Sequence, residues 1–289
     1  MRLRLAALVG AVVLALLAGY AVGRVANRPA AGAGATSALD AAPGIPAHSH
    51  QQDALQISGE TSGLTVSAGG YTLVPGATSF VAGRAQPFTF HIQGPNGQRV
   101  RTFAVRNDKP MHLIVVRRDL SGYRHLHPSM APDGTWGMDL SLPEPGTWRA
   151  YADFTATESG GGETSAVLGV DLVAAGAYEP RALAPPADVS TVDGMAVNFT
   201  GQFRVGPTQP LMFWVPAQVQ PYLGAYGHLV ILRSGDLLYV HVHPEPQLAN
   251  GAVKFWTAAP SPGRYRMFFD FQVDGQVRTA EYTLAVGQS

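Results

Sequence analysis

Cysteine is absent from this sequence of 289 residues. Without thiols the chain has no disulfide bond, thiol nucleophile, iron–sulfur cluster or cysteine-ligated zinc ribbon. A blue-copper centre is excluded as well, because its copper is held by a Cys thiolate. The lipid-carrying cysteine of a bacterial lipoprotein is also missing. Metal chemistry in this chain would therefore depend on nitrogen, oxygen or thioether ligands.

Charge of either sign is also scarce. Charged residues make up 14% of the chain, and 20 basic residues balance 20 acidic ones to a formal net charge of zero. With no basic stripe and no acidic tail, the sequence predicts no nucleic-acid partner. A serine nucleophile elbow, an HExxH zinc motif and a phosphate-binding glycine loop are absent too. These absences favour a protein that is not an enzyme.

The third feature in short supply is helical periodicity. From about residue 60 onward no stretch repeats its apolar residues every 3.6 positions, and short β-forming segments alternate with turn signals such as Pro-Asp-Gly. The chain is long enough for two domains of about 100–120 residues each. We predict two tandem antiparallel β-sandwiches or barrels, domain 1 at 59–175 and domain 2 at 187–289, joined by a linker at 176–186.

Several strands can be predicted individually. The segments 100–106 and 237–243 are expected to be strands, and a closing hairpin is expected at 263–286. Its turn is Asp274-Gly275, a pair that favours the type I′ turn. Four apolar side chains of its first strand share one face and are expected in the core, namely Tyr265, Met267, Phe269 and Phe271.

The N-terminus carries the one long apolar run. Two arginines precede Leu5–Gly23, which is 19 residues without a charge and just long enough to span a bilayer. We predict an uncleaved signal-anchor helix at 1–23, a flexible Ala/Gly/Pro stalk at 24–58, and C-terminal domains outside the cytoplasmic membrane. The alternative is secretion after cleavage near Ala31-Gly32-Ala33.

Histidine is what the sequence offers instead, in a duplicated pattern. Six of the nine histidines form two sets with the same spacing, 13 and then 2 residues, and a shift of 116 superposes them. The sets are His112, His125 and His127, and His228, His241 and His243. Tyr123 falls on Tyr239 in this alignment, and with a shift of 117 Asp153 falls on Asp270. The chain therefore contains an internal duplication.

The spacing can be converted into geometry. A turn at 234–236 would pair residues whose numbers sum to about 471, which places His228 opposite His243 and, by the same argument, His112 opposite His127. An H-x-H pair in a strand points both rings to one face. Each copy would thus present three imidazoles on one face, close enough to ligate one metal ion with a fourth position left for water, Met or carboxylate.

A structural role for the histidines is the competing interpretation. His228 shares its strand face with Val230 and Leu232, so its ring could be a buried polar group that is satisfied by hydrogen bonds. Asp153 and Asp270 are expected to anchor strand ends or to pair with Arg149 and Arg266.

Three segments together resemble a known group of proteins. Lys109–Arg117 reads KPMHLIVVR, His125–Pro128 reads HLHP, and Pro145–Phe154 contains PGTWR and DF. This combination resembles actinobacterial secreted or membrane-anchored proteins, a group described only as secreted or metal-binding, over most of residues 60–286. The resemblance implies immunoglobulin-like or cupredoxin-like β-sandwiches and no particular activity. More distantly the chain resembles periplasmic copper-resistance proteins, and Met111, Met130 and Met138 fit that pattern loosely.

The leading hypothesis is an extracytoplasmic, membrane-anchored metal-binding protein, with copper favoured over zinc, for sequestration or delivery. His112, His125 and His127 would bind one ion, and His228, His241 and His243 another. Replacing His241 and His243 would then remove half the metal. The alternative is a non-catalytic surface-binding module with structural histidines. A third option, a metal-activated hydrolase, would need a general base such as Glu245. The metal identity and any protein partner stay open.

Overall fold

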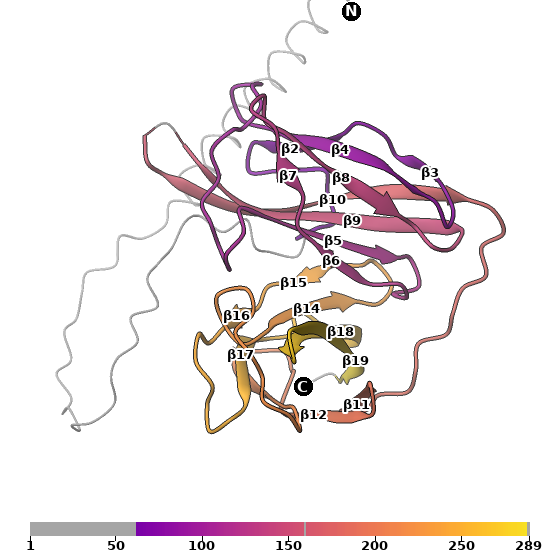
Figure 1. Cartoon of the computed structure of the whole chain (residues 1–289), viewed down its shortest axis with the longest axis vertical. Coiled ribbons are helices and arrows are strands. Elements are labelled where there is room, and N and C mark those ends of the chain that lie inside the picture. Colours follow the sequence, from indigo (N-terminus) through magenta and orange to yellow (C-terminus); the bar gives the residue numbers. More distant parts are fainter. Residues whose placement is uncertain (1–61, 159, 288–289) are drawn as a thin grey trace, which may run out of the picture. The chain divides into compact units, whose positions relative to one another are not determined.

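The computed structural model describes residues 62–158 and 160–287, and every regular element within them is a β-strand. The strands form two successive sandwiches (Figure 1), which we call repeat 1, residues 62–175, and repeat 2, residues 187–287. The predicted all-β class and the tandem antiparallel sandwiches are confirmed. The predicted signal-anchor and stalk lie outside the described residues. Within the described ranges no helix has the length and apolarity to span a membrane.

Repeat 1 consists of two five-stranded sheets. Its outer sheet has the order β1-β2-β4-β8-β7 and its inner sheet the order β3-β10-β9-β5-β6. The outer strands are β1 (Ser67–Ala68), β2 (Tyr71–Pro75), β4 (Ala85–Gln93), β7 (Ser129–Met130) and β8 (Thr135–Ser141). The inner strands are β3 (Ser79–Val81), β5 (Met111–Arg117), β6 (Arg124–Leu126), β9 (Gly146–Thr157) and β10 (Glu163–Ala175). A core of buried aromatic and aliphatic side chains, including Phe88, Phe90 and Trp136, fills the space between the sheets.

Repeat 2 is built in the same way. Its outer sheet has the order β11-β12-β13-β17-β16 and its inner sheet the order β15-β14-β18-β19. The outer strands are β11 (Val189–Val192), β12 (Met195–Gly201), β13 (Gln209–Trp214), β16 (His243–Pro244) and β17 (Val253–Thr257). The inner strands are β14 (His228–Arg233), β15 (Tyr239–Val240), β18 (Gly263–Val273) and β19 (Gln276–Val286).

The closing hairpin β18–β19 forms as predicted. Asp274 and Gly275 have φ angles of 52° and 72°, which is the pair of left-handed residues that a type I′ turn needs. The four side chains predicted for the core of this hairpin all lie in the core of repeat 2: Tyr265, Met267, Phe269 and Phe271.

Two strand predictions are wrong. Segment 100–106 makes only isolated bridges, from Phe103 to Ala156 and from Arg106 to Lys109, because it crosses between the sheets without a continuous partner. Segment 237–243 divides instead of continuing: β15 pairs with β14 in the inner sheet, whereas β16 pairs with β17 in the outer sheet.

The central inner strands are buried on both faces. In β5, Leu113 and Val115 point into the core of repeat 1, while Ile114 and Val116 belong to a separate cluster. That cluster, which we call the inter-repeat core, also contains residues of β9, β14 and β18. Its members are Ile114, Val116, Leu120, Tyr151, Val167, Val230, Leu232, Leu237, Tyr239 and Phe268. The two inner sheets therefore pack on each other through a second apolar layer.

Equivalent aromatic residues of the two repeats exchange contacts across this layer. Tyr123 of repeat 1 stacks on Phe268 of repeat 2, with ring centroids 4.0 Å apart and planes 5° apart. Tyr239 of repeat 2 lies against Tyr151 of repeat 1 at 5.6 Å. Because the alignment pairs Tyr123 with Tyr239, the duplicated modules pack as an approximate internal dimer.

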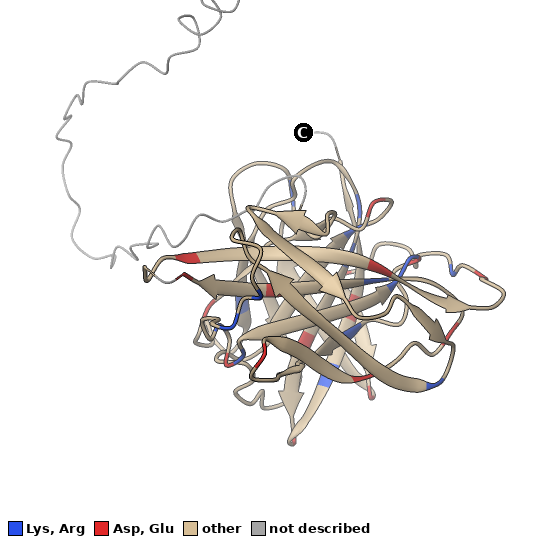
Figure 2. Cartoon of the chain, turned by 90° about the horizontal axis from the view of Figure 1, so that it is seen from above, with Lys and Arg blue, Asp and Glu red and all other residues tan. Residues whose placement is uncertain are grey.

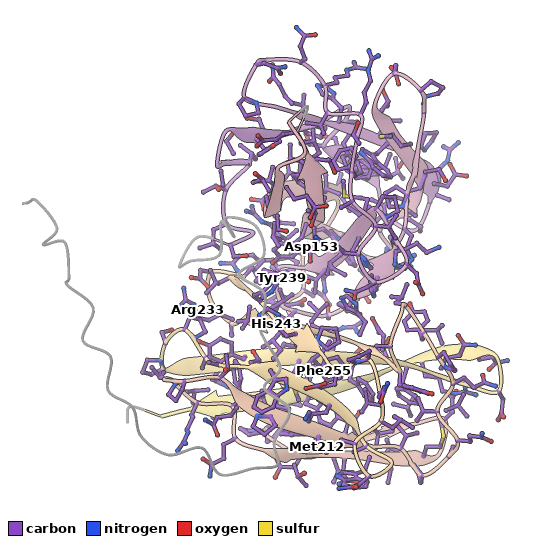
Figure 3. All side chains as sticks on the ribbon, turned by 90° about the vertical axis from the view of Figure 1, so that its left-hand side faces the viewer. Asp153, Met212, Arg233, Tyr239, His243 and Phe255 are labelled. Carbon is purple, nitrogen blue, oxygen red and sulfur yellow. The ribbon has the colours of Figure 1, made fainter. Side chains whose placement is uncertain are left out.

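A reciprocal pair of hydrogen bonds follows the same symmetry. The Tyr123 hydroxyl donates to Asp270 Oδ2 at 2.9 Å, and the Tyr239 hydroxyl donates to Asp153 Oδ2 at 3.2 Å. Figure 3 shows Tyr239 and Asp153 close together where the repeats meet. Each repeat thus supplies one tyrosine and one buried or half-buried carboxyl group to its neighbour.

The linker between the repeats is held at several points. The Arg181 amide donates to Asp119 Oδ2 at 2.8 Å, and Arg264 of repeat 2 donates to the Ala184 carbonyl at 3.1 Å. Leu183 packs on the inter-repeat core. Lys, Arg, Asp and Glu are interspersed over both repeats (Figure 2), in keeping with the zero formal charge.

The inter-repeat core makes a specific stability prediction. Phe268 is fully buried, and Phe268→Ala should lower the free energy of unfolding by about 3–5 kcal/mol, because the Tyr123 ring loses its stacking partner and a cavity forms. Chemical denaturation of the full chain would measure it. The matched control is Trp214→Ala, which truncates an aromatic ring that is 37% exposed and should change little. Equal effects of the two substitutions would contradict the packing described.

Candidate metal centre

Two equivalent histidines face each other across the inter-repeat interface. His112 lies on β5, on the face that carries Ile114 and Val116, and His228 occupies the same place on β14. Strand alternation alone puts both rings on the interface side. Their centroids are 5.1 Å apart with planes 20° apart, and both residues are buried.

His125 completes a compact group. It lies on β6 opposite Ile114, and its Nε2 is 2.9 Å from His112 Nδ1. Its ring centroid is 4.4 Å from that of His228. The three residues can offer one ring nitrogen each such that all three atoms lie within 4.8 Å of one another. We call His112, His125 and His228 the histidine cluster. It draws its members from both repeats.

His127 lies at the edge of this cluster. Strand β6 ends at Leu126, one residue before it, yet its ring centroid is 5.1 Å from His112 and 4.7 Å from His125. Its Nε2 is buried and has no hydrogen-bond partner among the described residues. Buried polar atoms are nearly always satisfied. This nitrogen therefore marks a position where a further interaction is expected.

The predicted second set of three does not come together in the same way. The β14–β15 pairs Ile231–Val240 and Leu232–Tyr239 have the predicted register, with residue numbers that sum to 471. The pairing ends there, and His243 pairs with Trp256 in the outer sheet instead of facing His228. That placement was wrong because the strand changes sheets at His241. The His241 and His243 rings lie 4.5 Å apart, while His228 has joined the first set.

Asp270 anchors the outer side of the cluster. Its side chain is 2% exposed, and Oδ2 is 2.9 Å from His125 Nδ1. Tyr123 donates to the same oxygen at 2.9 Å, and the Thr279 hydroxyl donates to Oδ1 at 2.6 Å. Burial and this neighbouring carboxyl group raise the pKa of Tyr123 well above its usual value, so its hydroxyl remains a donor.

The predicted ion pairs of Asp153 with Arg149 and of Asp270 with Arg266 do not form. Arg266 pairs with Glu281, and Arg149 pairs with Asp171 at 2.8 Å. Arg266 and Asp270 are four residues apart in one strand. Because a strand rises about 3.3 Å per residue, their side chains are farther apart than an ion pair allows. The duplication could have indicated the observed contacts, because its alignment pairs Tyr123 with Tyr239 and Asp153 with Asp270, the residues that meet across the interface.

Protons in this chain of contacts can be assigned by elimination. His112 Nε2 is 3.0 Å from the Arg106 carbonyl, which can only accept, so Nε2 carries a proton. In a neutral His112 the Nδ1 atom then accepts, and His125 Nε2 donates to it. A neutral His125 must therefore accept at Nδ1, which places the next proton on the Asp270 carboxyl group.

Burial supports the neutral assignment. It lowers the pKa of His125 and of His228 well below the usual value, and neighbouring histidines act in the same direction. Burial also lowers the pKa of His127 to about 4. The pKa of Asp270 is raised, again mainly by desolvation. At neutral pH these imidazoles are uncharged, which is the form that binds metal ions.

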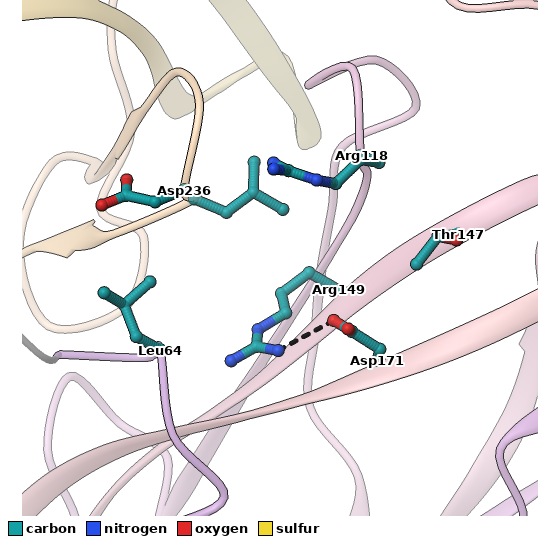
Figure 4. Close-up of a pocket in the computed structure, with 7 residues that line it drawn as sticks. Leu64, Arg118, Thr147, Arg149, Asp171 and Asp236 are labelled. Carbon is teal, nitrogen blue, oxygen red and sulfur yellow. Dashed lines mark hydrogen bonds and ion pairs between the residues drawn. The ribbon is translucent and has the colours of Figure 1, made fainter.

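A separate pocket of about 260 Å³ lies elsewhere along the inter-repeat boundary (Figure 4). Arg118 and Arg149 of repeat 1 and Asp236 of repeat 2 are among its lining residues. Arg149 is already engaged there, by Asp171 at 2.8 Å and by the Gly63 carbonyl at 2.7 Å. Its charge is thus compensated within the protein, and the histidine cluster is the stronger candidate site.

Comparison with known families agrees with the duplication. A family model described as "Domain of unknown function (DUF8832)" matches residues 65–166 and, a second time, residues 190–288. No curated protein matches the chain in sequence.

Solved structures give only weak similarities. The chain is 14% identical to the Escherichia coli adhesin FdeC over 77% of its own length and 65% of the adhesin's length, with a TM-score of 0.26. It is 12% identical to a Salmonella alpha-2-macroglobulin over 77% and 15% of the two chains, with a TM-score of 0.28. For invasin, a bacterial integrin-binding protein, the identity is 14%, the coverages 77% and 41%, and the TM-score 0.24. Similarities of this size support no argument about function.

The depressed histidine pKa values predict that acid destabilises the metal-free protein. An unfolded histidine titrates near pH 6.5, whereas His127 titrates at about 4 in the fold, so between these values the unfolded state binds more protons. Stability should thus be full above about pH 6.5 and decline as the pH falls toward 4. Asp270, whose pKa is raised, acts in the opposite sense and offsets part of the loss.

Calorimetric Tm values of chelator-treated protein, measured from pH 7.5 to pH 4.5, would test this expectation. The variant His127→Gln removes one titrating group and should show a shallower decline. A Tm that stays constant over this range would contradict the presence of buried neutral histidines.

Proposed function

The chain belongs to the family described as a domain of unknown function (DUF8832), and we propose that it is a metal-binding protein that holds one ion between its two repeats. The observation that carries the proposal is the convergence of His112, His125 and His228, three imidazoles whose ligand atoms lie within 4.8 Å of one another. One shared ion replaces the initial hypothesis of one ion in each repeat.

The donor set suits a transition metal. Two nitrogens on one tetrahedral ion lie roughly 3.3 Å apart, given metal–nitrogen bonds of about 2.0–2.1 Å. His112 Nδ1 and His125 Nε2 are 2.9 Å apart, so a small opening of this contact suffices. His127, with its unpartnered buried Nε2 beside both rings, is the candidate for a fourth ligand.

The ring nitrogens on the far side of the cluster support the same proposal. Metal-bound histidines almost always donate their other N–H to a carbonyl or carboxylate. His112 has the Arg106 carbonyl for this purpose, and His125 has Asp270. A bound ion would take the place of the proton between the two rings, and His125 would then donate from Nδ1 to the Asp270 carboxylate.

Copper is the favoured ion and zinc the alternative. Imidazole ligands suit both, and the Irving–Williams order places Cu(II) above Zn(II). His112 is 4% exposed and His228 8% exposed, so the site fits retention of an ion for sequestration or delivery better than turnover of a substrate. We therefore propose a binding role without catalysis.

The proposed location outside the cytoplasmic membrane rests on the sequence. Leu5–Gly23 would anchor the chain, residues 24–58 would form the stalk, and both repeats would be extracytoplasmic. This placement would expose the repeats to copper and zinc from the environment.

One observation favours a second candidate, in which the cluster is structural. The contacts from Arg106 through His112 and His125 to Asp270 form a closed hydrogen-bond chain that satisfies these groups without a metal. The repeats would then be a surface-binding module that is stiffened by polar contacts. Metal would change neither its stability nor its binding.

Metal stoichiometry separates the candidates. The full chain, purified in mild detergent without a His tag, would be equilibrated with copper or zinc and desalted for mass spectrometric metal analysis. We expect one retained equivalent and a rise in Tm, because an ion that binds only the folded state stabilises it. His228→Ala should abolish retention, whereas His243→Ala, at the exposed counterpart in the same repeat, should leave it unchanged.

Other outcomes are equally distinct. Two equivalents that fall to one when His241 and His243 are replaced would restore the hypothesis of one site in each repeat. Failure of the wild-type chain to retain either ion, with a Tm insensitive to metal, would favour the structural cluster.

A further inference from the structure

We propose that Asp270 is the positioning residue of the metal site, acting through His125, and that Tyr123 and Thr279 hold it in place. This inference rests on the proposed function. Asp270 itself contributes no ligand in this arrangement. Its role is to fix the orientation of a ligand supplied by the other repeat.

The carboxyl group of Asp270 is held from several directions. It lies on β18 directly opposite His228 on one side and opposite Thr279 of β19 on the other. Oδ1 accepts from Thr279 at 2.6 Å, and Oδ2 accepts from Tyr123 at 2.9 Å. A side chain that is 2% exposed and bonded at both oxygens has little freedom to rotate.

This fixed carboxyl group determines where His125 points. Its Oδ2 is 2.9 Å from His125 Nδ1, and the opposite ring nitrogen, Nε2, is then directed at His112 Nδ1. A His125 ring that donates from Nδ1 to this carboxyl group presents the lone pair of Nε2 on the side of His112. A carboxylate in this place also makes the imidazole a more basic ligand.

The contacts pass from one repeat to the other more than once. In repeat 1, His125 lies on β6 and Tyr123 directly precedes that strand. In repeat 2, Asp270 and Thr279 lie on the β18–β19 hairpin, and Asp270 contacts both residues of repeat 1. Tyr123 also stacks on Phe268, two residues before Asp270 in the same strand. Orientation of the ligand therefore depends on the docking of the two inner sheets.

The duplication supplies a matched control. Asp153 is the counterpart of Asp270: it lies opposite His112 in β9, as Asp270 lies opposite His228, and it accepts from Tyr239 at 3.2 Å. Strand β15 ends at Val240, however, so the pairing equivalent to Ile114–His125 is not continued to His241. Asp153 acts electrostatically on His241, and the hydrogen bond that its carboxyl group accepts comes from Tyr239.

The test compares Asp270→Asn with Asp153→Asn in the full chain, using Co²⁺ as the probe. Each substitution weakens one tyrosine contact across the interface, but only Asp270→Asn replaces the carboxyl group that contacts His125. We expect Asp270→Asn to bind Co²⁺ about 10–100-fold more weakly and to alter the visible d–d spectrum of the bound ion. Asp153→Asn should match the wild type in both affinity and spectrum.

Tyr123→Phe and Tyr239→Phe form a second matched pair, which removes one hydroxyl each and keeps both carboxyl groups. Tyr123→Phe should weaken Co²⁺ binding by a smaller factor and shift the spectrum, whereas Tyr239→Phe should do neither. This pair decides the matter if Asp270→Asn proves too unstable to purify. Tm values of the metal-free variants show whether a loss of binding merely follows a loss of folding.

The outcomes separate this inference from the proposed function. A wild-type chain that binds neither Co²⁺ nor copper or zinc overturns the proposed function. A wild-type chain that binds Co²⁺, together with Asp270→Asn or Tyr123→Phe variants that bind it with unchanged affinity and spectrum, overturns the role of Asp270 and leaves the site intact.

Discussion

Apolar packing between the two inner sheets is the interaction on which the remaining structure depends. Strands β5 and β14 are buried on both faces, so each must cover a second apolar surface after its own sandwich has formed. Burying one Val, Leu, Ile or Phe side chain contributes about 1.5–3 kcal/mol. The inter-repeat core contains ten buried aliphatic and aromatic residues, two of them tyrosines. Their combined burial is enough to keep two small domains associated. Without this layer, His112 and His228 would lie on separate, solvent-exposed sheets.

The polar groups lie along the same strands as the apolar ones, and this determines their chemistry. His112 continues the face of Ile114 and Val116, and Asp270 continues the face of Phe268. Packing the apolar part of each strand therefore removes water from the polar part. Desolvation opposes charge, which lowers the pKa of His125 and His228 and raises that of Asp270. The outcome is that His125 and His228 are neutral and lie near one buried carboxyl group.

Duplication produced near symmetry but not two equal sites. The tyrosine–aspartate contacts occur twice, from Tyr123 to Asp270 and from Tyr239 to Asp153. The histidines differ because β5 and β6 pair Ile114 with His125 in repeat 1, whereas the equivalent pairing with His241 does not form in repeat 2. There the chain leaves the inner sheet after Val240. One strand end thus decides that His125 belongs to the shared cluster. The two equivalent histidines His112 and His228 then stack on each other in this shared cluster.

The sequence by itself determined the β class, the internal repeat, the β18–β19 hairpin and its Asp274-Gly275 turn, because these follow from local periodicity and turn chemistry. It also identified the histidines of the cluster and the hairpin register that points them to one face. Only the tertiary structure decided their grouping. Spacing within a repeat contains no information on which apolar face meets which, so the partnership of His228 with His112 and the contact of Asp270 with His125 were not predictable. Those contacts form only when the exposed apolar faces of the two inner sheets pack on each other, and these faces exist only after each repeat has folded.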